Sequence, residues 1–162
     1  MELSDEQEEL LKQRQKGVLP EIELPGQVYV VDWKERVLRP KDRLDLMPLK
    51  FGEKGKGFYA DGYHFLYDTE KKEFVEIDDF KLRSNIVIIK LPGGLVLDPV
   101  GVARESGLNE RLFIASNPII PKLSAEVLRV SKNEIRRMIN NKIWKVPLIT
   151  RVARKFKKGR GK

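Results

Sequence analysis

Residues 85–91 read Asn-Ile-Val-Ile-Ile-Lys-Leu, and this stretch decides the fold class of the chain. Ile86–Ile89 are four consecutive β-branched apolar residues, which favour a strand over a helix. A run this short, followed at once by Pro92-Gly93-Gly94, is typical of a buried central strand. It falls far short of the roughly 18 apolar residues of a membrane span. We therefore predict a sheet with residues 85–91 near its centre.

The residues before this strand predict its antiparallel neighbours. They hold runs rich in Val, Ile, Tyr, Phe and Trp, one of which alternates charged and apolar residues, and short polar turns separate them. The predicted strands are Gln27–Trp33, Arg36–Arg39, Tyr63–Tyr67 and Glu73–Ile77, with a continuation after the glycines at Leu95–Leu97. A further short strand is predicted from Leu44 and Leu46 and then Leu49 and Phe51. Pro48 interrupts the strand at Leu49, and the glycines of 52–57 predict a loop.

A helix is predicted before the sheet. Ser4 with Gln7 three residues later has the form of a capping box. The helix would run to about Lys16 and end at Gly17, a residue common just after helix ends. Its apolar stripe is narrow, so we expect a loosely held surface helix.

Two or three helices are predicted after the sheet. Asp98-Pro99 would open one of them, with Asp at the N-cap and Pro in the first turn, and Gly107 would close it. Ser131 with Glu134 forms a second capping box. Residues 111–123 predict no definite element, because Pro118 and Pro121 exclude a long one.

Together these elements predict an α+β fold. We expect a mostly antiparallel sheet of about five to seven strands, an N-terminal surface helix and two or three C-terminal helices. The expected divisions are an N-terminal helix at 1–17, a single α+β domain at 18–145, and a basic amphipathic helix with a disordered tail at 146–162.

Composition excludes several classes of site. The chain has 162 residues and no cysteine, so disulfides, thiolate nucleophiles and cysteine-bound metals cannot form. His64 is the only histidine and has no evident catalytic partner, which argues against an enzyme. The glycine-rich loop at 52–57 lacks the Gly-Lys-Ser/Thr ending of a phosphate-binding loop. From these absences we expect neither a metal nor a cofactor. The N-terminus has no apolar signal region, so we expect a cytoplasmic protein.

Charge is divided unevenly along the chain. Residues 120–162 hold fourteen Lys and Arg against two acids and carry +12, whereas residues 1–119 carry −4. An excess this one-sided predicts an anionic partner. The candidate polyanion-binding residues are Lys132, Arg136, Arg137, Arg151, Arg154, Lys155, Lys157, Lys158 and Arg160.

The basic segment is open to several further interpretations. In residues 148–158, apolar Ile149, Val152, Ala153 and Phe156 alternate with cations at helical spacing. Such a stripe is typical of a helix packed on the domain's own core, and also of helices on anionic membrane surfaces. Residues 124–138 have the spacing of a helix-turn-helix motif that would expose cations to a major groove. The cations could also serve only to solvate the chain.

Three motifs give the chain a family resemblance. Leu24–Trp33 ends in Val-Val-Asp-Trp, residues 65–69 contain Tyr-Asp-Thr, and Val96–Arg104 contains Leu-Asp-Pro-x-x-x-Ala-Arg. In this series the chain resembles a family of small uncharacterised bacterial proteins, mostly from Bacteroidetes, over about residues 18–142. The resemblance implies one α+β domain and carries no activity with it. The segment from Leu148 onward lies outside the resemblance.

These observations favour a non-catalytic binding module that holds nucleic acid or another polyanion through its basic C-terminal segment. The alternative is an accessory subunit that recognises an acidic partner protein. The sequence leaves the oligomeric state open.

Overall fold

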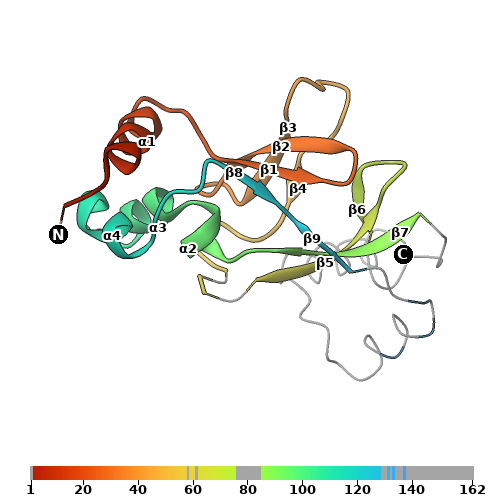
Figure 1. Ribbon diagram of the computed structural model, residues 1–162. Helices are drawn as coiled ribbons and strands as arrows, with labels where there is room; N and C mark the ends of the chain where they lie inside the picture. The colour runs from red at the N-terminus through yellow and green to blue at the C-terminus, as the bar shows by residue number, and fades with distance from the viewer. Residues whose placement is uncertain are drawn as a thin grey trace.

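The computed structural model describes most of the first 128 residues and three positions beyond them. The described residues are 2–57, 59–60, 62–75, 85–128, 131, 133 and 137. They confirm the predicted α+β class (Figure 1). No helix among them is long and apolar enough to cross a membrane.

Nine short strands and four helices make up the described part of the chain. The strands are β1 (Glu21–Leu24), β2 (Gln27–Asp32), β3 (Val37–Pro40), β4 (Leu49–Lys50), β5 (Tyr63–Asp68), β6 (Glu73–Val75), β7 (Ile86–Leu91), β8 (Lys122–Ser124) and β9 (Glu126–Leu128). The helices are α1 (Asp5–Gln15), α2 (Gly94–Leu97), α3 (Pro99–Glu105) and α4 (Glu110–Ser116).

The strands form two sheets that share one continuous segment. Sheet A has the order β4-β3-β2-β1-β8, and sheet B has the order β6-β5-β7-β9. All neighbours are antiparallel except β1 and β8, which run parallel. Only Ala125 separates β8 from β9, and its N–H bonds to the carbonyl of Glu23 at 2.9 Å. Residues 122–128 therefore join sheet A to sheet B (Figure 1).

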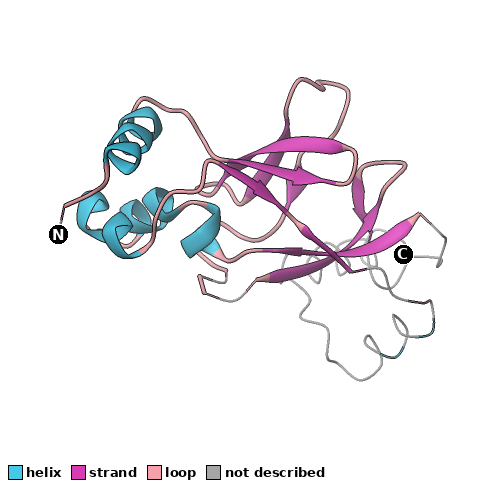
Figure 2. Ribbon diagram, viewed as in Figure 1, coloured by secondary structure: helices cyan, strands magenta, loops and turns pink. Residues whose placement is uncertain are grey.

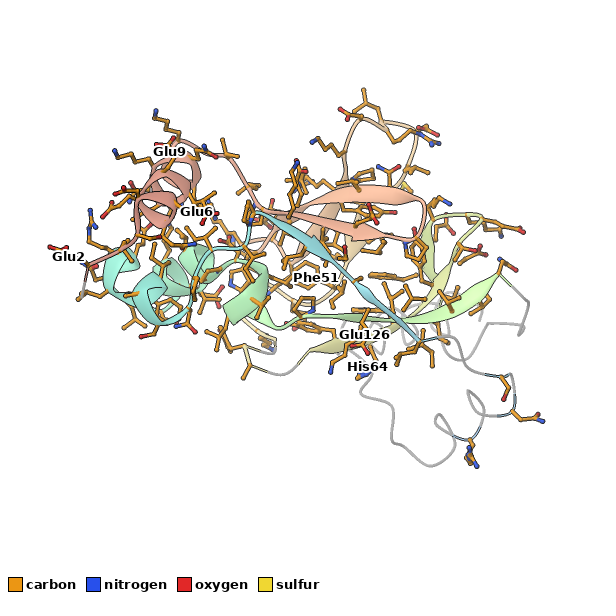
Figure 3. The ribbon with its side chains drawn as sticks, viewed as in Figure 1. Glu2, Glu6, Glu9, Phe51, His64 and Glu126 are labelled. Carbon is orange, nitrogen blue, oxygen red and sulfur yellow. The ribbon has the colours of Figure 1, made fainter. Side chains whose placement is uncertain are left out.

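The main core lies between the two sheets and is rich in aromatic rings. In β5, alternation sends Tyr63, Phe65 and Tyr67 inward, where all three are buried. The ring of Phe51 packs edge-on against Tyr63, with centroids 5.7 Å apart. Figure 3 shows Phe51 between the sheets. As predicted, β7 is central: it pairs with β5 on one side and β9 on the other.

The helices pack together at one end of the sheets (Figure 2). The chain enters α2, α3 and α4 after β7 and then returns to form β8 and β9, so these helices do not follow the last strand as predicted. The expected continuation at Leu95–Leu97 is also wrong, because these residues form the short helix α2. Pro99 does begin α3, but the carboxylate of Asp98 makes no cap and bonds Arg14 instead.

Helix α1 is held far more firmly than its narrow apolar stripe predicts. Ser4 caps it as expected, accepting from the Gln7 N–H at 3.2 Å. The Gln7 side chain, however, does not complete a capping box, because it exchanges hydrogen bonds of 3.0 and 2.8 Å with the backbone of Ile119. Leu11 is buried in a second cluster with Val100 and Ile114. The predicted surface helix is therefore confirmed, since only Leu11 of α1 is buried, but its attachments to the body did not follow from the sequence.

The helix-turn-helix interpretation is also wrong. Ser124 ends β8 and Glu126–Leu128 form β9, so the first helix of the motif is replaced by strand. Pairing with β1 and β7 overrides the local helical spacing. The proposed basic helix and tail at 146–162 lie outside the described residues.

Candidate functional site

A charged side chain with no exposed surface marks the turn between β2 and β3. Arg36 is 0% exposed, and its backbone has a φ of 56°, which is uncommon for a residue other than glycine. Its N–H bonds to the carbonyl of Trp33 at 3.1 Å and closes the turn. The guanidinium carbon lies 3.6 Å from the centre of the Trp33 ring, a cation–π contact.

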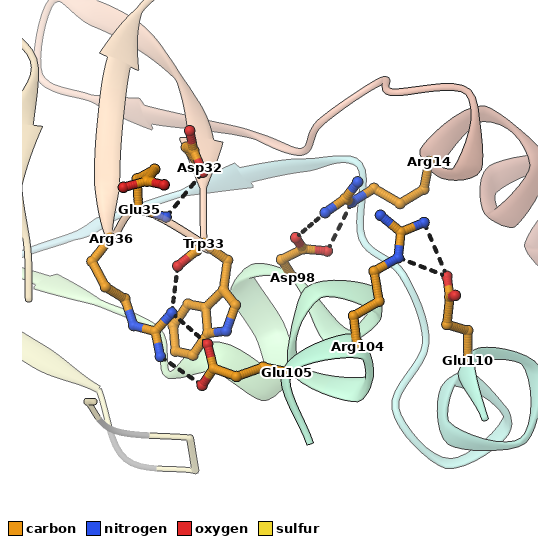
Figure 4. A network of polar contacts seen from close by, with 9 residues as sticks. All are labelled: Arg14, Asp32, Trp33, Glu35, Arg36, Asp98, Arg104, Glu105 and Glu110. Atoms are coloured by element: carbon orange, nitrogen blue, oxygen red, sulfur yellow. Dashed lines mark hydrogen bonds and ion pairs between the residues drawn. The ribbon is translucent and has the colours of Figure 1, made fainter. Parts of the chain in front are cut away.

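The Arg36 side chain bonds both a carboxylate and backbone carbonyls (Figure 4). Two of its nitrogens donate to the carboxylate of Glu105 on α3 at 2.8 and 3.0 Å, in the forked geometry typical of arginine. Its Nε donates to the carbonyl of Lys56 at 2.7 Å, and Nη1 also contacts the carbonyl of Trp33. The side chain thereby ties α3 and the loop at 52–57 to the β2–β3 turn.

Glu105 is held in its ionised form. The hydrogen bonds from Arg36 lower the pKa of its carboxyl, and the Tyr59 hydroxyl at 2.6 Å adds to this, while partial burial opposes it. The same contact with Glu105 raises the pKa of Tyr59. A carboxylate with a lowered pKa is a poor proton acceptor at neutral pH, so the geometry of Glu105 favours an ion pair over a general base.

One buried donor in the cluster lacks a partner among the described residues. Trp33 is 1% exposed, and its Nε1–H makes no hydrogen bond with them. The indole lies against α2 and α3, where Gly94 of α2 and Gly101 of α3 leave room for it (Figure 4). A Cβ on Gly101 would lie 3.1 Å from the Trp33 ring and 2.5 Å from the Asp98 carboxylate. A side chain at position 101 would therefore displace one of them.

A pocket of about 560 Å³ lies next to this cluster. Its size suits a small molecule. Its lining combines cationic and acidic side chains with two glycines: Arg14, Leu19, Asp32, Lys34, Lys54, Gly55, Gly101, Arg104 and Glu105.

Most of the charges that line the pocket are already compensated. Arg14 bonds the buried carboxylate of Asp98 at 2.7 Å, and Arg104 pairs with Glu110 at 3.1 Å (Figure 4). Lys54 lies 3.6 Å from the carboxylate of Glu35. A small anion would have to compete with these acids, so the pocket is not an evident anion site.

His64 lies on the outer face of sheet B. Its cross-strand neighbour is Lys90, and the neighbour of Lys90 on β9 is Glu126, so the three form a polar row. Figure 3 shows His64 and Glu126 on the same side of the sheet. His64 is half-buried. No group of three His, Asp or Glu among the described residues could hold a metal.

The structure describes one of the nine predicted polyanion-binding residues. Arg137 is described, helical and exposed. The other eight lie outside the described residues: Lys132, Arg136, Arg151, Arg154, Lys155, Lys157, Lys158 and Arg160.

Sequence reasoning missed the cluster at Trp33, Arg36 and Glu105. Arg36 and Glu105 are 69 positions apart, so no local pattern links them. The only local signal was a tryptophan between Asp32 and Lys34 at the end of a strand.

No protein-family model, curated protein or solved structure matches this chain.

Proposed function

We propose that this chain is a cytoplasmic, non-catalytic binding module that holds nucleic acid through its basic C-terminal segment, residues 129–162. The division of charge carries the proposal. That segment holds thirteen Lys and Arg against one acid, Glu134, and has a net charge of +12. Residues 1–128 carry −4, so the whole positive excess of the chain follows β9, the last strand of the described residues.

The physical basis is the neutralisation of phosphates. Each Lys or Arg that contacts a phosphate releases condensed counterions, which makes binding strong at low salt and weak at high salt. Such contacts fix the protein on a duplex or strand and read little sequence. Arg137, which is exposed, is available for such a contact.

The described residues up to 128, which we call the body, support a binding role for the basic segment. Its arginines are largely committed to internal pairs with acids on other elements, as with Arg14 and Asp98 or Arg36 and Glu105. Arg111 of α4 likewise pairs with Glu8 of α1. A body that commits its arginines to its own packing favours the basic segment as the contact for an external polyanion.

One observation favours a second candidate, an accessory subunit that recognises an acidic protein. The loop between β3 and β4 exposes two large apolar side chains, with Leu44 fully exposed and Met47 largely so. Apolar side chains of this kind occur at protein contacts and have no use in phosphate binding. Persistence of a complex in high salt and after nuclease treatment would favour this candidate.

The test compares two variants with equal loss of charge. Each replaces five basic residues with Gln and lowers the net charge of the chain from +8 by the same amount. The segment variant changes Arg151, Arg154, Lys155, Lys157 and Lys158. The body variant changes the exposed Lys12, Lys16, Lys50, Lys71 and Lys122.

Binding is measured by fluorescence anisotropy with labelled duplex DNA and single-stranded RNA, at about 50 and about 200 mM salt. We expect the segment variant to lose at least about tenfold in affinity at the lower salt, and the body variant to lose much less. Equal affinities for the two variants, or no binding by the unaltered protein at the lower salt, would overturn the proposal.

A further inference from the structure

The pocket of about 560 Å³ is bordered by four segments that lie far apart in the sequence. Leu19 comes from the link between α1 and β1, and Lys34 comes from the β2–β3 turn. Lys54 and Gly55 belong to the loop after β4, and Gly101 belongs to α3. A hollow of this size, with side chains converging from several elements, is the usual form of a small-molecule site.

The walls of this pocket are mostly apolar, although six of its nine lining residues are charged. Four of the six bond charged side chains that do not line the pocket: Arg14 with Asp98, Asp32 with Arg39, Arg104 with Glu110 and Glu105 with Arg36. These four residues therefore present mainly their carbon stems to the pocket. The interior suits a ligand with an apolar body.

The two remaining charged residues, Lys34 and Lys54, place positive charge at the rim. Lys34 is exposed and makes no ion pair or hydrogen bond within the part of the chain that the structure describes. Lys54 is 64% exposed, and its ammonium lies 3.6 Å from the carboxylate of Glu35, beyond hydrogen-bonding distance. Both flexible side chains can therefore turn toward a negative group at the mouth of the pocket.

We propose that this pocket binds a small amphipathic carboxylate, with its apolar body against Leu19 and Gly101 and its anionic head at Lys34 and Lys54. The apolar body supplies most of the affinity, because Arg14 and Arg104 are already paired with acids and do not serve a bare anion. The site lies entirely in the body, so it does not rest on the proposed binding of nucleic acid.

Trp33 provides a spectroscopic reporter beside the pocket. A Cβ on Gly101 would lie 3.1 Å from Cδ1 of the indole, the atom bonded to Nε1, so the N–H edge of the ring adjoins Gly101. The chain has two tryptophans, Trp33 and Trp144, and each indole N–H gives its own signal in a proton–nitrogen correlation spectrum. The signal that survives in Trp144→Phe is that of Trp33. An aromatic ligand seated at Gly101 should shift this signal through its ring current.

The probe is 2-naphthoate, which joins an apolar ring system to a single carboxylate. Its two parts are tested separately: 2-naphthylmethanol keeps the rings, and acetate keeps the anionic head. Each compound is titrated into the full chain while the Trp33 N–H signal is followed. We expect a Kd of about 1 mM or lower for 2-naphthoate. We expect the alcohol to bind about three- to fivefold more weakly, because it lacks the charge, and acetate to leave the signal unmoved.

Two substitutions test the proposed contacts. Lys34→Gln should weaken the binding of 2-naphthoate about three- to fivefold and leave that of the alcohol unchanged, because this lysine meets only the carboxylate. The matched control is Lys71→Gln, which removes an exposed lysine in the β5–β6 turn and should change neither affinity. Leu19→Glu should weaken both compounds, and 2-naphthoate by at least about tenfold, since it replaces an apolar wall with a negative charge.

Four results would overturn the inference. They are no binding of 2-naphthoate up to about 10 mM, binding that leaves the Trp33 signal unmoved, equal affinities for the acid and the alcohol, and equal losses in Lys34→Gln and Lys71→Gln. If Leu19→Glu does not fold, Lys34→Gln still decides, because Lys34 is exposed. The titrations contain no nucleic acid, so failure of this site and failure of the proposed function are distinguishable.

Discussion

Arg36 and Glu105 show how a buried charge can be fully paired. The guanidinium has lost all contact with water, and it regains a bidentate carboxylate, two backbone carbonyls and the face of Trp33. Removing either partner would leave the other desolvated and unpaired, which is far more costly than never having had the pair.

We predict that Glu105→Gln lowers the free energy of unfolding by about 3 kcal/mol, because the buried Arg36 loses its counter-charge. Chemical denaturation at neutral pH measures this. The matched control is Glu110→Gln, which breaks an exposed pair with Arg104 on the neighbouring helix and should cost less than about 1 kcal/mol. Equal costs for the two variants would contradict a special role for the Arg36 pair.

The same pair predicts a pH dependence. The pKa of Glu105 is lower in the folded protein than in the unfolded chain, so its stabilisation is complete above the ordinary carboxyl pKa of 4.5. It is lost as the pH falls through the lowered folded pKa. The stability difference between the unaltered protein and Glu105→Gln should therefore be constant from pH 7 to about pH 5 and shrink below it. A difference that grows on acidification would refute this.

Tyr29 and Tyr67 offer a second prediction inside the core. Their hydroxyls lie 3.2 Å apart, both rings are buried, and burial raises the pKa of each phenol. Tyr67→Phe leaves the Tyr29 hydroxyl without this partner and should cost about 1–2 kcal/mol. Adding Tyr29→Phe should restore part of that loss, because no orphaned hydroxyl remains. Denaturation of both single variants and the double variant tests this, and simple additivity would contradict it.

At the scale of elements, the local sequence of α1 predicts the ends of the helix but not its contacts with the rest of the protein. The caps at Ser4 and Gly17 predict where the helix begins and ends, because capping involves adjacent residues only. The bonds from Gln7 to Ile119 and from Arg14 to Asp98 span 112 and 84 positions and leave no local trace. The helix is therefore predictable in extent but not in attachment.

We predict that Arg14→Met destabilises the protein by about 3 kcal/mol, because the carboxylate of Asp98 is 1% exposed and would lose its partner. Lys16→Met, an exposed change at the end of the same helix, should stay within about 0.5 kcal/mol. Thermal or chemical denaturation distinguishes them. Equal stability of the two variants would contradict the anchoring of α1.

Strands and helices differ in how far they follow from sequence. The strands β2, β5 and β7 are strongly apolar and β-branched or aromatic, and the sequence predicts them within a residue or two. The pair β8 and β9 lies in a stretch with helical spacing and two nearby prolines, and it becomes strand only by bridging β1 and β7. Such a bridge is a property of the assembled sheets, so no window of sequence contains it.

At the scale of the whole molecule, the body and the C-terminal segment carry opposite charge. Residues 1–128 carry −4 and residues 129–162 carry +12. The body provides a rigid, internally paired support, and the segment provides the charge.

The most direct test of this account is the salt dependence of duplex DNA binding. Each phosphate contact contributes about 0.9 to the slope of log K against log salt concentration. The segment variant with five Gln substitutions should therefore give a slope shallower than that of the unaltered protein by about 4 to 5, if each substituted residue contacts a phosphate. The body variant, with the same net charge, should keep the original slope. Identical slopes for the segment variant and the unaltered protein would contradict the account.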